Sequence, residues 1–199
     1  MTEPIQPPTA AVTTEKLTRC FGAQCAVDNV DLRVEAGTFY GFLGPNGAGK
    51  STTIKMLTGL LQPSSGSIRV LGKNPLDPSE AIEIKRQIGV VPDNLALFEY
   101  LTAVDYLTFI GRVASSMIRG LLQGFVERGG TVFLTSHILE IVERLCTHVG
   151  IIAGGKLVEQ TSLAEMRAGG TLEGRFLEKL GFQPESTARL NWLEATTRP

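Results

Sequence analysis

Residues 44–52 read Gly-Pro-Asn-Gly-Ala-Gly-Lys-Ser-Thr, the most informative segment of the chain. Its positions are Gly44, Pro45, Asn46, Gly47, Ala48, Gly49, Lys50, Ser51 and Thr52. A glycine, four further residues and then Gly-Lys-Ser make up the complete spacing of a phosphate-binding P-loop. An apolar run at 39–43 precedes the loop, and a helical pattern at 50–60 follows it. Spacing and context therefore predict a strand–loop–helix unit that binds a nucleoside triphosphate.

The residue types in the loop match the chemistry of a bound triphosphate. Glycines let backbone N–H groups turn inward around anionic oxygens, and the following helix directs its positive end at them. We expect Lys50 to reach the β- and γ-phosphates, Ser51 to ligate Mg²⁺, and Thr52 to bond the α-phosphate. The base-reading pattern Asn-Lys-x-Asp is absent from the sequence, so ATP is the expected nucleotide. The alternative is a glycine-rich turn that matches the spacing by coincidence.

Strand and helix patterns alternate along most of the chain. Apolar runs and loose alternation predict strands at 12–17, 30–34, 67–71, 88–91, 131–135, 149–153 and 156–159. Apolar residues at helical spacing predict helices at 77–87, 102–113, 115–128, 138–145 and 171–180. Mixed strands come first and strand–helix alternation follows. This order favours an α/β fold with a mainly parallel sheet and an antiparallel portion at the start.

Two local signals mark the chain after residue 150. Gly154 and Gly155 lie between two strand patterns and form a two-residue hairpin signal. Ser162 and Glu165 have the spacing of a capping box, which predicts the start of the next helix.

Composition limits the partners of the chain. Its 199 residues suggest one domain, and a hydrophobic share of 43% is that of a soluble globular protein. The net charge of −1 leaves no basic excess to hold nucleic acid or an anionic membrane. No apolar run approaches the roughly 18–20 residues that span a bilayer. We therefore expect no nucleic acid and no direct membrane insertion, so membrane association would run through a protein partner.

The termini and the cysteines add three expectations. Residues 1–11 have three prolines, one acidic and no basic residue, and are expected to form a disordered lead-in. Residues 181–199 are a weakly patterned tail. Cys20, Cys25 and Cys146 are an odd number without close ligand spacing, which argues against a disulfide framework or a zinc site. A reducing cytoplasm is therefore the expected compartment.

The sequence on both sides of the loop resembles that of a known protein family. Residues 42–53 read Phe-Leu-Gly-Pro-Asn-Gly-Ala-Gly-Lys-Ser-Thr-Thr, and 56–60 read Met-Leu-Thr-Gly-Leu. Residues 63–68 follow with Pro-Ser-Ser-Gly-Ser-Ile. With these segments the chain resembles the ATP-binding subunit of an ABC transporter over about 12–180.

The resemblance implies a fold, cofactors and partners. The implied fold is the α/β P-loop NTPase three-layer sandwich with an antiparallel portion at the N-terminus. ATP and Mg²⁺ are the implied cofactors. A transmembrane permease and a second ATP-binding subunit are the implied partners, which would hold the chain in the cytoplasm at the inner face of the cell membrane.

Three residues receive roles through the resemblance alone. Phe21 corresponds to an aromatic ring that stacks on adenine, although it could instead be a core residue. Asp93 stands where the family has a glutamine near the magnesium and the attacking water, and it is otherwise a turn residue after proline. His137 corresponds to the switch histidine at the γ-phosphate. His148 has no such context and is expected to be structural.

Two parts of the family pattern are missing from the sequence. No apolar run ends in Asp-Glu, the pair that orients magnesium and supplies the general base, and Leu-Ser-Gly-Gly-Gln does not occur. Residues to about 113 resemble one family helix, and residues from about 115 resemble a much later one. Several tens of family residues, including most of the helical subdomain, thus have no counterpart. The strand at 132–135 is expected to have an open edge as a result.

Four functional readings remain open from the sequence. The favoured one is an ATP-binding subunit whose hydrolysis is impaired. The others are an intact transporter ATPase, a different P-loop enzyme such as a small-molecule kinase, and a non-catalytic remnant that regulates an intact ATPase.

Overall fold

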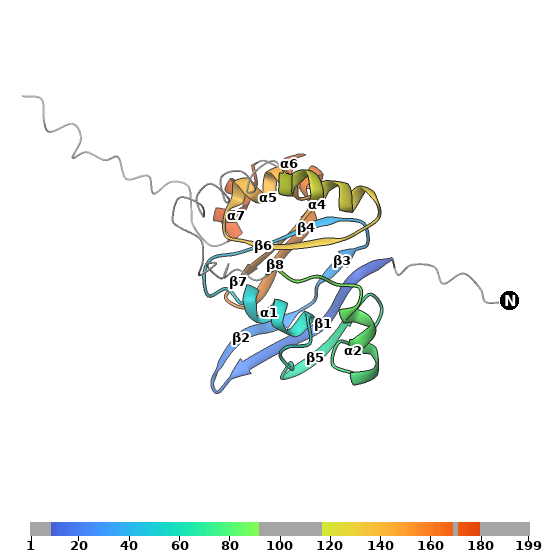
Figure 1. Ribbon diagram of the computed structural model, residues 1–199. Coiled ribbons are helices and arrows are strands. Elements are labelled where there is room, and N and C mark those ends of the chain that lie inside the picture. Colours follow the sequence, from blue (N-terminus) through green and yellow to red (C-terminus); the bar gives the residue numbers. More distant parts are fainter. Residues whose placement is uncertain (1–8, 92–116, 169–170, 180–199) are drawn as a thin grey trace, which may run out of the picture.

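The strand before the P-loop lies inside a four-stranded sheet (Figure 1). The computed structural model describes residues 9–91, 117–168 and 171–179. Strand β4 (Phe39–Leu43) lies between β6 (Val132–Ser136) and β7 (His148–Ala153), and both neighbours run parallel to it. Strand β8 (Lys156–Ser162) pairs with β7 antiparallel, which completes the order β6-β4-β7-β8. This is the mainly parallel sheet that the sequence predicts.

A second sheet, formed mainly near the N-terminus, is antiparallel throughout. Its central strand is β1 (Ala10–Phe21), which pairs with β2 (Gln24–Val30), β3 (Arg33–Glu35) and β5 (Ser65–Val70). The predicted antiparallel portion is therefore confirmed, and β1 begins ahead of the predicted start at residue 12.

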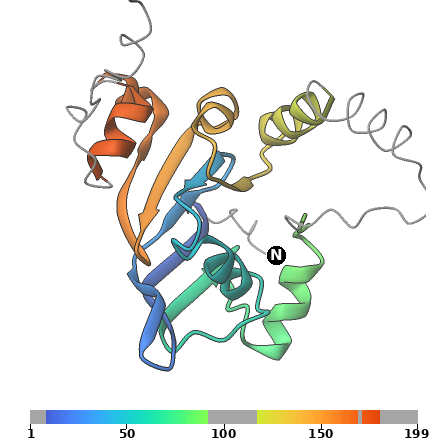
Figure 2. The ribbon, with the colours of Figure 1, turned by 90° about the vertical axis from the view of Figure 1, so that its left-hand side faces the viewer.

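The helices of the described residues are α1 (Lys50–Leu57), α2 (Pro78–Lys85), α4 (Met117–Glu127), α5 (Leu139–Leu145), α6 (Leu163–Ala168) and α7 (Leu172–Lys179). Some of them cover the two faces of the parallel sheet, whereas α2 and α4 lie to one side of the strands (Figure 2). In Figure 1, α1 lies between the two sheets, and α5, α6 and α7 lie over the opposite face of the parallel sheet. Contacts of α1 with β2 and β5, and of α5 with β4 and β6, agree with this layering.

The core reaches both faces of β4, because successive side chains of a strand point in opposite directions. Tyr40 and Phe42 join the cluster that includes Met56 of α1, whereas Leu43 joins a cluster with Val142 of α5. All five residues of β4 are buried. Burial raises the pKa of the Tyr40 phenol, whose hydroxyl donates a hydrogen bond to Gln160 Oε1 at 3.0 Å.

Strand β6 forms one edge of the parallel sheet. Within the described residues it pairs only with β4, and its residues are half-buried except for Ser136. This agrees with the open edge expected for residues 132–135. Next to it, β4 is covered on both faces and paired on both edges.

In the β1–β2 region the structure differs from the sequence prediction in two ways. The strand predicted at 30–34 is broken, because residues 31 and 32 lie between β2 and β3. The missed strand β2 contains Asp28 and Asn29, and Asn29 has a left-handed φ of 51°. These residue types are depleted in strands, which conceals the strand from a pattern search.

Residues 88–91 do not form the predicted strand. Val90 and Val91 are 51% and 87% exposed, so neither side chain is packed in a sheet. A strand needs a neighbour for its backbone groups, and within the described residues no strand pairs with this segment.

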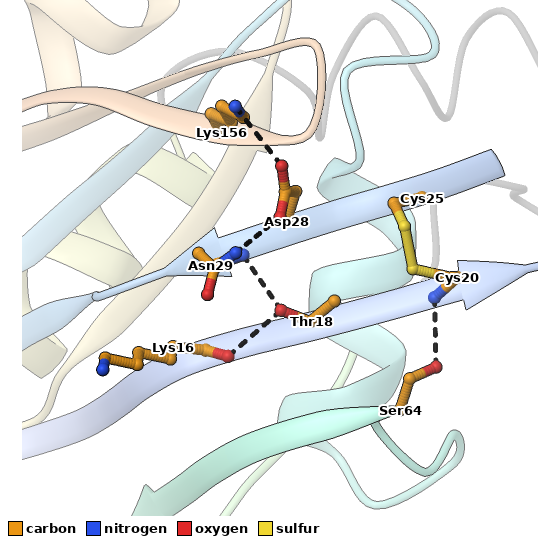
Figure 3. The surroundings of a disulfide bond; sticks show 8 residues. All are labelled: Lys16, Thr18, Cys20, Cys25, Asp28, Asn29, Ser64 and Lys156. Atoms are coloured by element: carbon orange, nitrogen blue, oxygen red, sulfur yellow. Dashed lines mark hydrogen bonds and ion pairs between the residues drawn. A yellow bond between two sulfur atoms is a disulfide. The ribbon is translucent and has the colours of Figure 1, made fainter. Parts of the chain in front are cut away.

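A disulfide between Cys20 and Cys25 contradicts the expectation of reduced cysteines (Figure 3). These residues are directly opposite each other in the β1–β2 hairpin, on either side of its turn. Counting cysteines could not reveal this, since the pairing depends on hairpin register. Cys146 is free, and burial raises the pKa of its thiol to about 12.

The capping box predicted after β8 is present. Ser162 Oγ accepts a hydrogen bond from Glu165 N–H at 3.1 Å, and Glu165 Oε2 accepts from Ser162 N–H at 3.2 Å. Among the described residues, no helix is long and apolar enough to cross a membrane.

Candidate functional site

The P-loop connects the end of β4 to the start of α1, and two of its glycines fit where no other residue would. A Cβ atom on Gly44 would lie 2.4 Å from the Ile152 carbonyl oxygen. A Cβ atom on Gly49 would lie 2.3 Å from the Ala26 carbonyl oxygen, and Gly49 has a φ of +108°. The loop therefore packs backbone against backbone on β2 and β7.

Hydrogen bonds fix the loop to the strands around it. Gly44 N–H donates to the Ser136 carbonyl at 3.3 Å, which links the loop to the end of β6. Gly155 N–H donates to the Ala48 carbonyl at 3.1 Å, and Asp28 N–H donates to the Gly155 carbonyl at 2.8 Å. The glycine hairpin at 154–155 thus ties the P-loop to β2.

An open cavity of about 540 Å³ lies at the loop. It is lined by Ala26, Asn46, Gly47, Gly49, Lys50, Ser51, Thr52, Thr135, Ser136 and His137. Parallel pairing explains how distant segments meet here, because Leu43 of β4 is in register with Ser136 of β6. In open α/β sheets, ligands bind outside the carboxyl ends of the strands, which is where this cavity lies.

Lys50 lies over the loop. Its Nζ donates to the carbonyl oxygens of Gly44 and Pro45 at 2.7 and 2.9 Å. A phosphate in the loop would offer this ammonium a charge-assisted partner, which forms stronger hydrogen bonds than a neutral carbonyl.

Ser51 and Thr52 occupy the first turn of α1, where backbone N–H groups point towards an anion. The Ser51 side chain is exposed and the Thr52 side chain is half-buried, and both line the cavity. Their hydroxyls can reach a metal ion or a phosphate there. The next residue, Thr53, is buried and donates its hydroxyl to the Gly49 carbonyl at 3.0 Å.

His137 follows β6 and is exposed at the same cavity. The chain turns there because Ser136 Oγ accepts from Ile138 N–H at 2.9 Å. The structure therefore brings His137 together with the P-loop residues. His148 instead begins β7, where its Nδ1 lies 3.0 Å from Thr147 Oγ1.

Phe21 does not line the cavity. It ends β1 and is 52% exposed, so it is not a core residue. The Arg19 guanidinium carbon lies 4.6 Å from the centroid of its ring. Asp93 falls outside the described residues.

Sequence reasoning assigned no role at the site to Ala26, Thr135 and Ser136, although the cavity lining includes them. Thr135 and Ser136 directly precede His137, so their place after an apolar strand was an available signal. Among the described residues, this lining contains no carboxylate.

A strand that passes through a glycine-rich loop into a helix, beneath a cavity at the carboxyl ends of parallel strands, defines a P-loop nucleotide-binding fold. The family model for "ABC transporter" matches residues 27–169. The chain therefore belongs to the ABC transporter family, as an ATP-binding subunit of the P-loop NTPase fold. The family and the fold predicted from the sequence are confirmed.

Curated relatives match over different lengths. The bacitracin transport ATP-binding protein BcrA of Bacillus licheniformis is 30% identical over 212 residues, covering 75% of this chain and 69% of the relative. The daunorubicin/doxorubicin resistance ATP-binding protein DrrA of Streptomyces peucetius is 44% identical over 106 residues. That match covers 53% of this chain but only 32% of the relative.

Solved structures show the same fold. The structure of an ATP-binding subunit of an ABC transporter superposes with a TM-score of 0.67 at 20% identity, covering 85% of this chain and 99% of that chain. A dimeric ATP-binding cassette in a post-hydrolysis state, bound to ADP and Pi, gives 0.60 at 19% identity, covering 76% and 98%.

Proposed function

We propose that this chain binds MgATP through residues 44–52, as the ATP-binding subunit of a membrane transporter, with impaired hydrolysis. One observation carries the proposal. The cavity joins the complete P-loop to His137, yet its described lining holds no carboxylate to activate water. The proposed binding roles are those of Lys50 on the β- and γ-phosphates, Ser51 on Mg²⁺ and Thr52 on the α-phosphate.

The missing acidic strand supports impaired hydrolysis. A positioned general base contributes typically about 10²–10⁴-fold to a rate, and no apolar run of the sequence ends in an acidic pair. Phosphoryl transfer also depends on a residue that orients the attacking water. In this proposal Asp93 lies near the metal and His137 near the γ-phosphate, but neither replaces the absent pair.

Alignment length supports the proposal that a segment is missing. The match to the bacitracin transport protein spans 212 positions but uses 75% of the 199-residue chain, so about 60 positions face no residue here. In the described part of the chain one edge of β6 has no neighbour, and a further parallel strand could pair there. Loss of a strand at that edge would account for both observations.

The proposed partners follow from the relatives. One relative is named for bacitracin transport, and one solved cassette is dimeric. We propose that this chain pairs with a second ATP-binding subunit and with a permease at the inner face of the membrane. The edge of β6 that no described strand covers favours one alternative, in which the chain is a non-catalytic partner of an intact ATPase.

Titration calorimetry of the full chain with MgATP tests this function. Lys50→Ala should weaken binding at least about tenfold, because charge-assisted hydrogen bonds to phosphate are lost. Lys55→Ala is the matched control, since Lys55 is exposed on the same helix and does not line the cavity. Failure of the wild-type chain to bind MgATP, or equal effects of the two variants, would contradict the proposal.

A further inference from the structure

The β1–β2 hairpin has two different faces near its turn. Residues directly opposite each other in an antiparallel pair project to the same side. Arg19 is opposite Val27, and Phe21 follows Arg19 by two residues, so all three share one face. Cys20 and Cys25 are also opposite each other and project to the other face, where the disulfide links the strands (Figure 3).

The face that carries Phe21 is turned towards the P-loop. Val27 is fully buried in the core cluster that includes Ala48 of the loop and Met56 of α1. A Cβ on Gly49 would lie 3.4 Å from Val27 Cγ2, so β2 packs directly on the loop. The ring of Phe21, 52% exposed, therefore projects from the same face of the hairpin that packs on the P-loop.

Arg19 holds that ring from one side. Its guanidinium lies 4.6 Å from the Phe21 ring centroid, within the range of a cation–π contact. Its NH1 donates to the Gln62 carbonyl at 3.1 Å, in the segment that follows α1. In the described part of the chain, no carboxylate pairs with Arg19, and its buried Nε has no hydrogen-bond partner.

We propose that Arg19 is a positioning residue for recognition of the nucleotide base. It fixes the Phe21 ring from one face so that the other face can stack on a planar base. The bond to Gln62 links this platform to the helix that begins at the P-loop. This inference rests on the proposed function, because it assumes that a nucleotide occupies the loop.

The test separates base recognition from phosphate recognition in the full chain. Affinities for MgATP and for magnesium inorganic triphosphate are measured side by side. Arg19→Ala should weaken MgATP binding about three- to tenfold, the range of a cation–π contact, and leave triphosphate binding unchanged. Arg19→Lys keeps the charge without the planar group and should give an intermediate loss. Arg69→Ala, an exposed arginine of β5, is the control.

A double-mutant cycle with Phe21→Leu shows whether Arg19 acts through the ring. Phe21→Leu alone should lower MgATP affinity by about tenfold, and Arg19→Ala should add nothing in that background. An equal effect of Arg19→Ala in both backgrounds, or an equal loss of triphosphate binding, would overturn the inference. Failure of the wild-type chain to bind MgATP would instead overturn the proposed function. Should Arg19→Ala not fold, the same comparisons with Arg19→Lys decide the outcome.

Discussion

Strands β4 and β6 are neighbours in one sheet, yet they differ in how completely they are covered. All residues of β4 are buried and both its edges are paired, and it leads into the P-loop. Strand β6 is half-buried, has one unpaired edge among the described residues, and leads to His137. Among the described residues, the strand that leads into the P-loop is therefore packed and paired on all sides, whereas the strand that leads to His137 is not. The proposed function has the same asymmetry, with nucleotide binding retained and hydrolysis impaired.

The largest expected effect is on stability. It is measured by removing one aromatic ring from β4 and, separately, one from β6. Phe42 is fully buried on β4, whereas Phe133 on β6 is half-buried and lies 5.5 Å from it between ring centroids. Phe42→Ala should cost about 3–5 kcal/mol of unfolding free energy, and Phe133→Ala less than half as much. Urea unfolding measures both. Equal losses would mean that β6 is as well packed as β4.

The next effect concerns the loop that β4 positions. Gly49→Ala places a Cβ 2.3 Å from a backbone oxygen, so it should weaken MgATP binding by at least about tenfold and lower the melting temperature. Gly47 also has a positive φ, of +80°, but its Cβ would meet nothing within 4 Å. Gly47→Ala should therefore cost only about 1 kcal/mol of backbone strain. A Gly49→Ala variant that binds and melts like Gly47→Ala would show that the loop is loosely packed.

A smaller effect should appear in self-association through the edge of β6. Its residues Val-Phe-Leu-Thr-Ser carry no charge and no proline, the features that natural edge strands use against pairing. Leu134→Lys should reduce concentration-dependent association measured by sedimentation. Val158→Lys on β8, at the opposite edge, is the control. A larger reduction of association by Val158→Lys would show that the chains associate through β8 and not through β6.

The smallest expected effect is a pH dependence of stability where β8 leads into α6. Hydrogen bonds from the Thr161 side chain, and from the Ser162 backbone and side chain, hold the pKa of Glu165 below its ordinary value. A lowered carboxyl pKa contributes stability that is present above the unfolded value of about 4.3 and is lost as pH falls through the folded value. Glu165→Gln should remove this contribution. Thermal melts at pH 7 and pH 3 should differ less in the variant than in the wild-type chain.

Local sequence patterns predicted those parts of the fold whose causes are local. The strand at 39–43, the P-loop and the capping box at Ser162 agree with the structure. The prediction of a strand at 88–91 is wrong, because a strand also needs a neighbouring strand to pair with and none of the described strands pairs with this segment. The disulfide was missed because Cys20 and Cys25 meet only through hairpin register.

At the site, too, local sequence patterns predict only the features that do not depend on contacts between distant segments. Spacing alone predicts the P-loop residues, whereas the resemblance to the family is what assigns a role to His137. Ala26 could not be found in this way, since it reaches the cavity only because β2 packs on the loop. Arg19 stood two residues before Phe21 in the sequence, but its contact with the ring is a feature of the folded hairpin.

A single-turnover hydrolysis assay shows whether the chain binds ATP without cleaving it. The full chain, in excess over labelled ATP with Mg²⁺, is sampled over time for bound ATP and released phosphate, with Lys50→Ala and Lys55→Ala alongside. We expect the wild-type chain and Lys55→Ala to retain ATP largely unhydrolysed, and Lys50→Ala to retain none. Rapid phosphate release by the wild-type chain and Lys55→Ala, absent in Lys50→Ala, would instead show that hydrolysis is not impaired.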